Sequence, residues 1–184
     1  MIKKILALLF ALFVVACTKP STTLPEEPNR GPDSGEGQLY INDLAAAIRA
    51  ADRIVVSEHS NAFDVLDQET QPQLPKNYKP VIYASHELTP LERAEFLKTV
   101  TQLPPRTQDL EPACIFQPHH TITFYRAGKQ ASAMVICFHC GQVEWNGTGK
   151  TKPWSLVKGL GKLVTSVGMH EERDWYALVR THKE

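Results

Sequence analysis

The sequence predicts an α+β domain in which a small antiparallel sheet carries helices packed on one face. Three observations predict this class. Apolar residues recur at helical spacing near residues 44 and 160, and the segment between residues 121 and 145 alternates like strands joined by turns. The helices and strands also follow no strict βαβ rhythm. The expected domain covers residues 38–184.

The first half of this domain predicts a helix followed by two strands. Residues 53–58 form a β-rich run, and residues 79–85 form the next strand. The helix before them is marked by apolar residues at helical spacing: Tyr40, Leu44, Ala47, Ile48 and Ala51.

A second helix start is encoded by residues 89–92. Thr89 can cap the first turn, Pro90 fits the first helical position, and Glu92 completes a capping box. This helix is expected to run to about Thr101, because two consecutive prolines follow shortly after it.

The second half is richer in strands. Residues 121–125 alternate apolar and polar side chains, Gly128-Lys129 makes a turn, and the apolar run 131–138 completes a hairpin. A third strand at residues 142–145 ends at the turn pair Asn146-Gly147.

An amphipathic helix follows, closed by Gly168 and weakened by Gly159 and Gly161. Its apolar stripe consists of Leu156, Leu160, Leu163, Val164 and Val167. Beyond it, the acidic residues from Glu171 to Asp174 are expected to form a solvated face. Four scattered histidines are expected at the surface or only partly buried: His59, His86, His170 and His182.

Residues 1–16 have the features of a secretory signal peptide. Lys3 and Lys4 give a positive start, and the apolar run from Ile5 to Val15 would span only about 16 Å as a helix, too short to cross a membrane core of about 30 Å. The run ends in Val-Val-Ala-Cys, which resembles the lipobox of bacterial lipoproteins, where the cysteine is acylated and becomes the new N-terminus. This resemblance implies lipidation at Cys17. The alternative is an ordinary cleaved signal peptide in which this cysteine is incidental.

Residues 17–37 are expected to form the lipidated N-terminus and a disordered tether. Pro, Ser, Thr, Glu and Gly dominate this stretch, so it has little apolar surface to bury. In the lipoprotein family an Asp after the acylated cysteine retains the protein in the inner membrane, and here that residue is Thr18. The resemblance therefore implies anchoring in the outer membrane, with the domain facing the periplasm.

Charge and motif patterns exclude two classes of ligand. The formal net charge is 0, and loss of Lys3 and Lys4 with the signal leaves a slightly acidic chain without a basic stripe. Residues 147–151 end like a phosphate-binding loop, but the glycine which that pattern requires five positions before Gly149 is Glu144. No nucleic acid and no nucleotide is therefore expected as a partner.

The strongest chemical signal is a cluster of cysteines and histidines, which pairing across the predicted hairpin would bring together. One interpretation is a zinc site formed by Cys114, His120, Cys137 and Cys140, in which His119 could take the place of His120. The other is a disulfide between Cys114 and either Cys137 or Cys140, which an oxidising compartment favours.

The step Cys137-Phe138-His139-Cys140 also resembles the Cys-Pro-His-Cys of periplasmic thiol oxidases in the thioredoxin class. In that class the first cysteine lies at a helix N-terminus after a strand. Here Gly141 and a strand-like run follow, which departs from that pattern.

Residues 114–143 resemble a group of uncharacterised bacterial proteins, many of them lipoproteins. The resemblance implies no activity, but it favours His120 over His119 as the functional histidine. His139 departs from the acidic or polar residue of the pattern. The pattern is carried here by Cys114, Pro118, His120, Cys137, Phe138 and Cys140.

Two functions of different classes remain open. The first is a non-enzymatic lipoprotein domain that binds a protein or another envelope component and has a structural Cys/His cluster. The second is a metal-dependent enzyme or thiol-redox factor that uses this cluster. A closed and buried cluster favours the first function, and a cavity opening onto the cluster favours the second.

Overall fold

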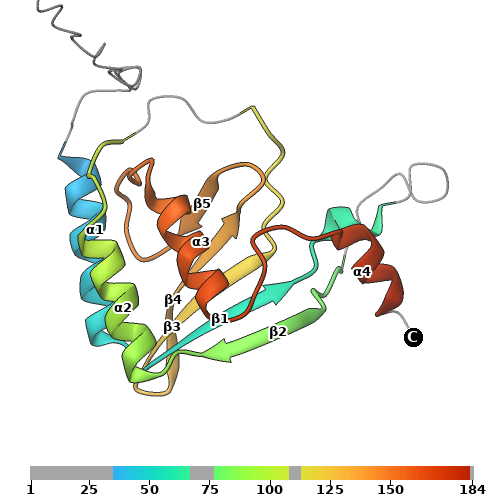
Figure 1. The fold of residues 1–184 in the computed structure, drawn as a ribbon, viewed down its shortest axis with the longest axis horizontal. Helices are drawn as coiled ribbons and strands as arrows, with labels where there is room; N and C mark the ends of the chain where they lie inside the picture. Colours follow the sequence, from blue (N-terminus) through green and yellow to red (C-terminus); the bar gives the residue numbers. More distant parts are fainter. Residues whose placement is uncertain (1–34, 67–76, 108–112, 183–184) are drawn as a thin grey trace, which may run out of the picture.

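A computed structural model describes residues 35–66, 77–107 and 113–182. It confirms the predicted class, because helices pack against an antiparallel sheet (Figure 1). The predicted signal peptide, the lipidation site Cys17 and most of the predicted tether lie outside the described residues. Within the described part of the chain, no helix is long and apolar enough to cross a membrane.

The sheet has five strands in the order β2-β1-β3-β4-β5, and every pair of neighbours is antiparallel. The central pair is formed by strands that lie far apart in the sequence, with Val56 opposite Ile122. The strands are β1 (Arg53–His59), β2 (Ile82–Glu87), β3 (His120–Arg126), β4 (Lys129–Cys137) and β5 (Gln142–Trp145).

Three helices pack together over one face of the sheet (Figure 1): α1 (Glu36–Ala50), α2 (Pro90–Thr101) and α3 (Leu156–Ser166). Side chains that alternate along the strands meet the apolar stripes of these helices, and the two sets form one core. The largest fully buried apolar residues are Phe96, Phe124, Leu44, Ile48, Ile54, Ile122, Met134, Ile136, Leu156 and Leu160.

Local signals fixed several of these elements as predicted. Thr89 and Glu92 form the reciprocal capping box of α2. The β3–β4 hairpin turns through Ala127 and Gly128, which both have positive φ, as a two-residue turn that matches the twist of the strands requires. Gly168, at φ 81°, follows α3.

Other boundaries differ from the prediction. Helix α1 begins at Glu36, inside the predicted tether, and Gly37 is buried. Strand β2 begins at Ile82 rather than Lys79, since pairing with β1 decides its limits and the pattern of apolar residues does not. Two short helices were not predicted, η1 (Ala62–Val65) and α4 (Trp175–Thr181), because each holds too few residues for a visible period.

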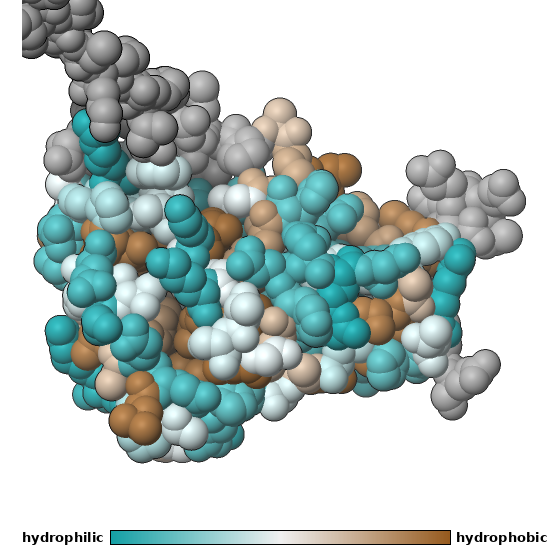
Figure 2. All heavy atoms as spheres, in the orientation of Figure 1, coloured by the Kyte–Doolittle hydropathy of each residue, from teal (hydrophilic) through white to brown (hydrophobic). Residues whose placement is uncertain are grey.

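The opposite face of the sheet, called the open face here, carries half-exposed side chains on its two central strands. These are Val55, Ser57, Thr121, Thr123 and Tyr125, with Ala133 and Val135 on β4. On the other side of the molecule, where α3 lies over the sheet, Figure 2 shows a mostly hydrophilic surface with scattered hydrophobic patches. The exposed large apolar residues are likewise dispersed: Leu39, Ile82, Leu91, Ile115 and Tyr176.

Candidate functional site

The predicted cysteine cluster forms at one end of the sheet. Cys114 and Cys140 are joined by a disulfide that spans 26 residues of sequence, with their Cα atoms 5.7 Å apart. Cys137 is a free thiol with 1% of its surface exposed. The structure therefore has the arrangement of the disulfide interpretation, with Cys140 rather than Cys137 as the partner of Cys114.

His120 lies beside these cysteines in the fold but is directed into the core. It opens β3 opposite Ile136, and its ring packs edge-on against Phe138 at a centroid distance of 5.0 Å. The side chain is fully buried, and neither ring nitrogen has a hydrogen-bond partner. Across the described residues, no group of three or more His, Cys, Asp or Glu side chains is arranged to hold a metal ion.

A buried carboxylate, Glu58, lies close to His120. Its side chain is 1% exposed, and Oε2 lies 3.9 Å from Nε2 of His120. Burial lowers the pKa of His120 to about 4, and the nearby carboxylate of Glu58 opposes this effect only in part. The imidazole is therefore neutral at pH 7.

The segment after α3 folds back to neutralise Glu58. The guanidinium of Arg173 donates Nη1–H to Oε1 of Glu58 at 2.5 Å, and the backbone N–H of His170 donates to Oε2 at 3.1 Å. A carboxylate so deeply buried needs such donors, because an unpaired one would cost several kcal/mol. This contact ties residues 170–173 to the end of β1.

A second acidic residue, Asp64, fixes His119. Asp64 completes the capping box of η1 by accepting the backbone N–H of Asn61 at 2.6 Å. Its other oxygen accepts Nε2–H of His119 at 2.9 Å. The indole of Trp175 stacks on the flat face of the His119 imidazole and covers it.

His59 makes a third polar contact close by, on the open face. Its Nδ1 lies 3.0 Å from the carbonyl oxygen of Ser60, so Nδ1–H donates there. Nε2 is then the acceptor for the hydroxyl of Thr121 at 2.8 Å. Burial lowers the pKa of His59, which keeps this tautomer neutral.

Sequence reasoning missed most of this polar network. His59 and His170 were expected at the surface or only partly buried; His59 is buried, whereas His170 is exposed and its backbone N–H bonds Glu58. The acidic residues Glu171, Glu172 and Asp174 are exposed, as expected, but the contacts that Arg173 and Trp175 make at the end of the sheet were not foreseen. Glu58 carried a signal that could have been used: it continues the inward alternation of Ile54 and Val56, and a charge at an inward position would require a buried partner.

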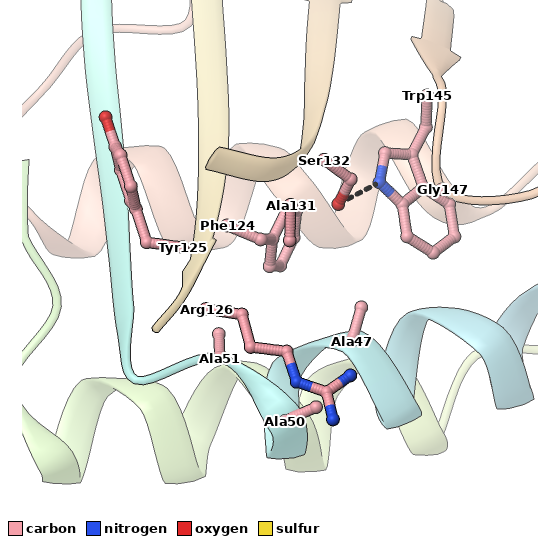
Figure 3. Close-up of a pocket in the computed structure, with 10 residues that line it drawn as sticks. All are labelled: Ala47, Ala50, Ala51, Phe124, Tyr125, Arg126, Ala131, Ser132, Trp145 and Gly147. Carbon is pink, nitrogen blue, oxygen red and sulfur yellow. Dashed lines mark hydrogen bonds between the residues drawn. The ribbon is translucent and has the colours of Figure 1, made fainter. Parts of the chain in front are cut away.

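A pocket of about 200 Å³ lies at the other end of the sheet, between α1 and the β3–β4 hairpin (Figure 3). Trp145 lines this pocket, and its indole Nε1–H already donates a hydrogen bond to the hydroxyl of Ser132 at 3.2 Å. None of the cysteines or histidines described above lines it. The lining residues are Ala47, Ala50, Ala51, Phe124, Tyr125, Arg126, Ala131, Ser132, Trp145 and Gly147.

Comparison of the chain with protein-family models, with curated proteins and with solved structures found no match. Its function therefore has to be inferred from its own residues and their arrangement.

Proposed function

We propose that this chain is a lipid-anchored protein of the bacterial outer membrane, whose domain faces the periplasm and binds a partner protein without catalysing a reaction. The anchor is Cys17, supported by the apolar run before it, the lipobox resemblance and Thr18 at the following position. Several acyl chains would hold the protein far more firmly than a single chain does.

The cysteine and histidine cluster supports a structural role for these residues. Cys137 and Cys140 are buried, and two of the three cysteines are bonded to each other. The ring of His120 has no solvent-exposed nitrogen to offer a substrate. A bonded pair of cysteines beside buried side chains of this kind holds the end of the sheet together.

The observation that carries the binding proposal is the open face of the sheet. Its small β-branched side chains, such as Val55 and Thr123, lose little conformational freedom when a partner covers them. Beside them, Arg53 places its guanidinium 3.8 Å above the ring of Tyr125 and contacts Glu87 at 3.9 Å, so that the rim of this face is polar. The face therefore combines small valine, alanine, serine and threonine side chains with Arg and Tyr at its rim, and Arg and Tyr are enriched in protein interfaces.

The shape of this face favours a protein over a small molecule. Ala133 and Val135 border a shallow depression of about 420 Å³, together with Glu144, Trp145 and Asn146. Small ligands need concave sites that enclose most of their surface, whereas a broad face with a shallow depression suits the side chains of a partner protein.

Site-specific photo-cross-linking in cells tests the proposal. A photoreactive amino acid at Thr123 should yield a discrete, protease-sensitive adduct in the envelope fraction. The same group at Lys158, which is exposed on the outer side of α3, serves as the control and should yield none. Val135, also on the open face, serves as a second test position. Adducts of the same mass from Thr123 and Lys158, or no adduct from Thr123 and none from Val135, would show that the open face is not a binding surface.

A further inference from the structure

At the end of the sheet, Cys140 lies between the other two cysteines and contacts both. Cys140 carries the disulfide to Cys114, and its backbone N–H donates to Sγ of Cys137 at 3.4 Å. A tight turn produces this approach: the N–H of Gly141 donates to the carbonyl of Phe138 at 3.0 Å. Gly141 has φ 63°, a conformation that glycine adopts without strain.

From this arrangement we propose that the cluster is a thiol–disulfide exchange site, in which Cys137 attacks the disulfide and releases Cys114. The thiolate of Cys137 attacks Sγ of Cys140, a Cys137–Cys140 bond forms, and the bond between Cys140 and Cys114 breaks. Cys114 leaves as a thiolate and takes up a proton equivalent to the one that Cys137 lost. No external oxidant or reductant is consumed.

The three cysteines differ in how far they are exposed to solvent. Cys137 and Cys140 are 1% and 5% exposed, whereas Cys114 is half-exposed on the segment before β3. The exchange therefore moves the free thiol from the core to the surface. There it can attack a disulfide of another protein, which forms a mixed disulfide and releases one thiolate of that protein.

This activity goes beyond the proposed binding function and does not depend on it. A structural disulfide beside an unrelated buried thiol would keep its bond to Cys114. An exchange site would instead populate a second bonding pattern, in which the two cysteines of the C-x-x-C step are joined. The two cases differ in which residue a thiol reagent modifies in the folded protein.

Trapping of the free thiol tests the exchange. The purified, folded protein is incubated at pH 8 with N-ethylmaleimide, and the modified cysteine and the remaining disulfide are identified by peptide mass spectrometry. The expected product carries the label on Cys114 and a Cys137–Cys140 disulfide. The variant Cys137→Ser lacks the attacking thiol, and its Cys114 should stay unlabelled over the same time.

Two further measurements keep the result independent of unfolding. Circular dichroism and thermal denaturation should show that Cys137→Ser is folded like the wild type. The variant Cys114→Ser should form a Cys137–Cys140 disulfide on mild oxidation, as the proposed product requires. The proposal is overturned if Cys114 of the wild type stays unlabelled, if Cys137→Ser labels there equally fast, or if Cys114→Ser keeps two free thiols.

Discussion

The indole ring of Trp175 lies nearly parallel to the imidazole ring of His119, with their centroids 4.3 Å apart and their planes inclined by 4°. This stack fastens the C-terminal helix α4 to the start of β3, far from it in the sequence. Trp175 also lies edge-on to His120 at 5.8 Å and parallel to Tyr83 at 6.3 Å. One side chain therefore contacts the edge strand β2 and the start of the central strand β3 at this end of the sheet.

Replacing Trp175 with alanine should lower the free energy of unfolding by about 3 kcal/mol, because it empties a site that is only 8% exposed. Denaturation in urea measures the change. Tyr176→Ala, at the next position and 40% exposed, is the matched control and should cost less than about 1 kcal/mol. Equal losses in the two variants would mean that the stack adds no stability.

The pair Glu58–Arg173 should show a clear coupling energy in a double-mutant cycle. Glu58→Gln and Arg173→Gln each leave one partner without its counter-charge, and the double variant removes both charges. Since the Arg173 side chain is 33% exposed, solvent screens part of the interaction, and we expect coupling of about 2 kcal/mol. A value below about 0.5 kcal/mol would make this contact no stronger than an ordinary surface ion pair.

Stability should fall as the pH decreases from 6.5 to 4. Over this range the unfolded chain protonates His120, with the ordinary pKa of 6.5, while the folded chain, with a pKa of about 4, does not. Protons therefore favour unfolding, by about 3 kcal/mol over the whole interval. The lowered pKa of His59 acts in the same direction.

Urea denaturation at several pH values measures this dependence. The variant His120→Leu should lose most of it, because the group that titrates only in the unfolded chain is gone. If the variant keeps the slope of the wild type, titration of another group must be responsible.

Gly37→Ala should destabilise the domain by at least about 2 kcal/mol. A Cβ atom at this position would lie 1.8 Å from the carbonyl oxygen of Pro105, and backbone cannot move aside cheaply. Gly149→Ala provides the control, since a Cβ there meets nothing within 4 Å. Thermal denaturation should separate the two variants; a shared melting temperature would contradict the close approach of α1 to residue 105.

Cys17→Ser should release the domain from membranes without changing its fold, because it removes the proposed site of acylation. Membrane fractionation after a salt wash and the mass of the mature N-terminus are the measurements. Circular dichroism of the released domain should match that of the wild type. A variant that still sediments with membranes after the wash would exclude a lipid anchor at this residue.

The sequence predicted those elements that carry their own local signal. The capping box at Thr89 and the alternation through β3 belong to this group, and both lie close to the expected positions. The pairing of β1 with β3 and the return of Arg173 to Glu58 could not be predicted, because they depend on packing between distant segments. At the site, the sequence predicted that the three cysteines lie close together, but it left the zinc and the disulfide interpretations open. It did not predict the polar network around Glu58.

The disulfide encloses the whole β3–β4 hairpin, since Cys114 precedes β3 and Cys140 follows β4. A protease that cuts the chain once anywhere between them leaves two fragments that are still covalently joined. On a lipid-anchored protein, the C-terminal fragment would then stay at the membrane after a nick in the turn at Gly128. If Cys140 were bonded to Cys137 instead, both cysteines would lie in the C-terminal fragment, which would lose its covalent attachment. Release of the fragment would therefore report which pair of cysteines is bonded.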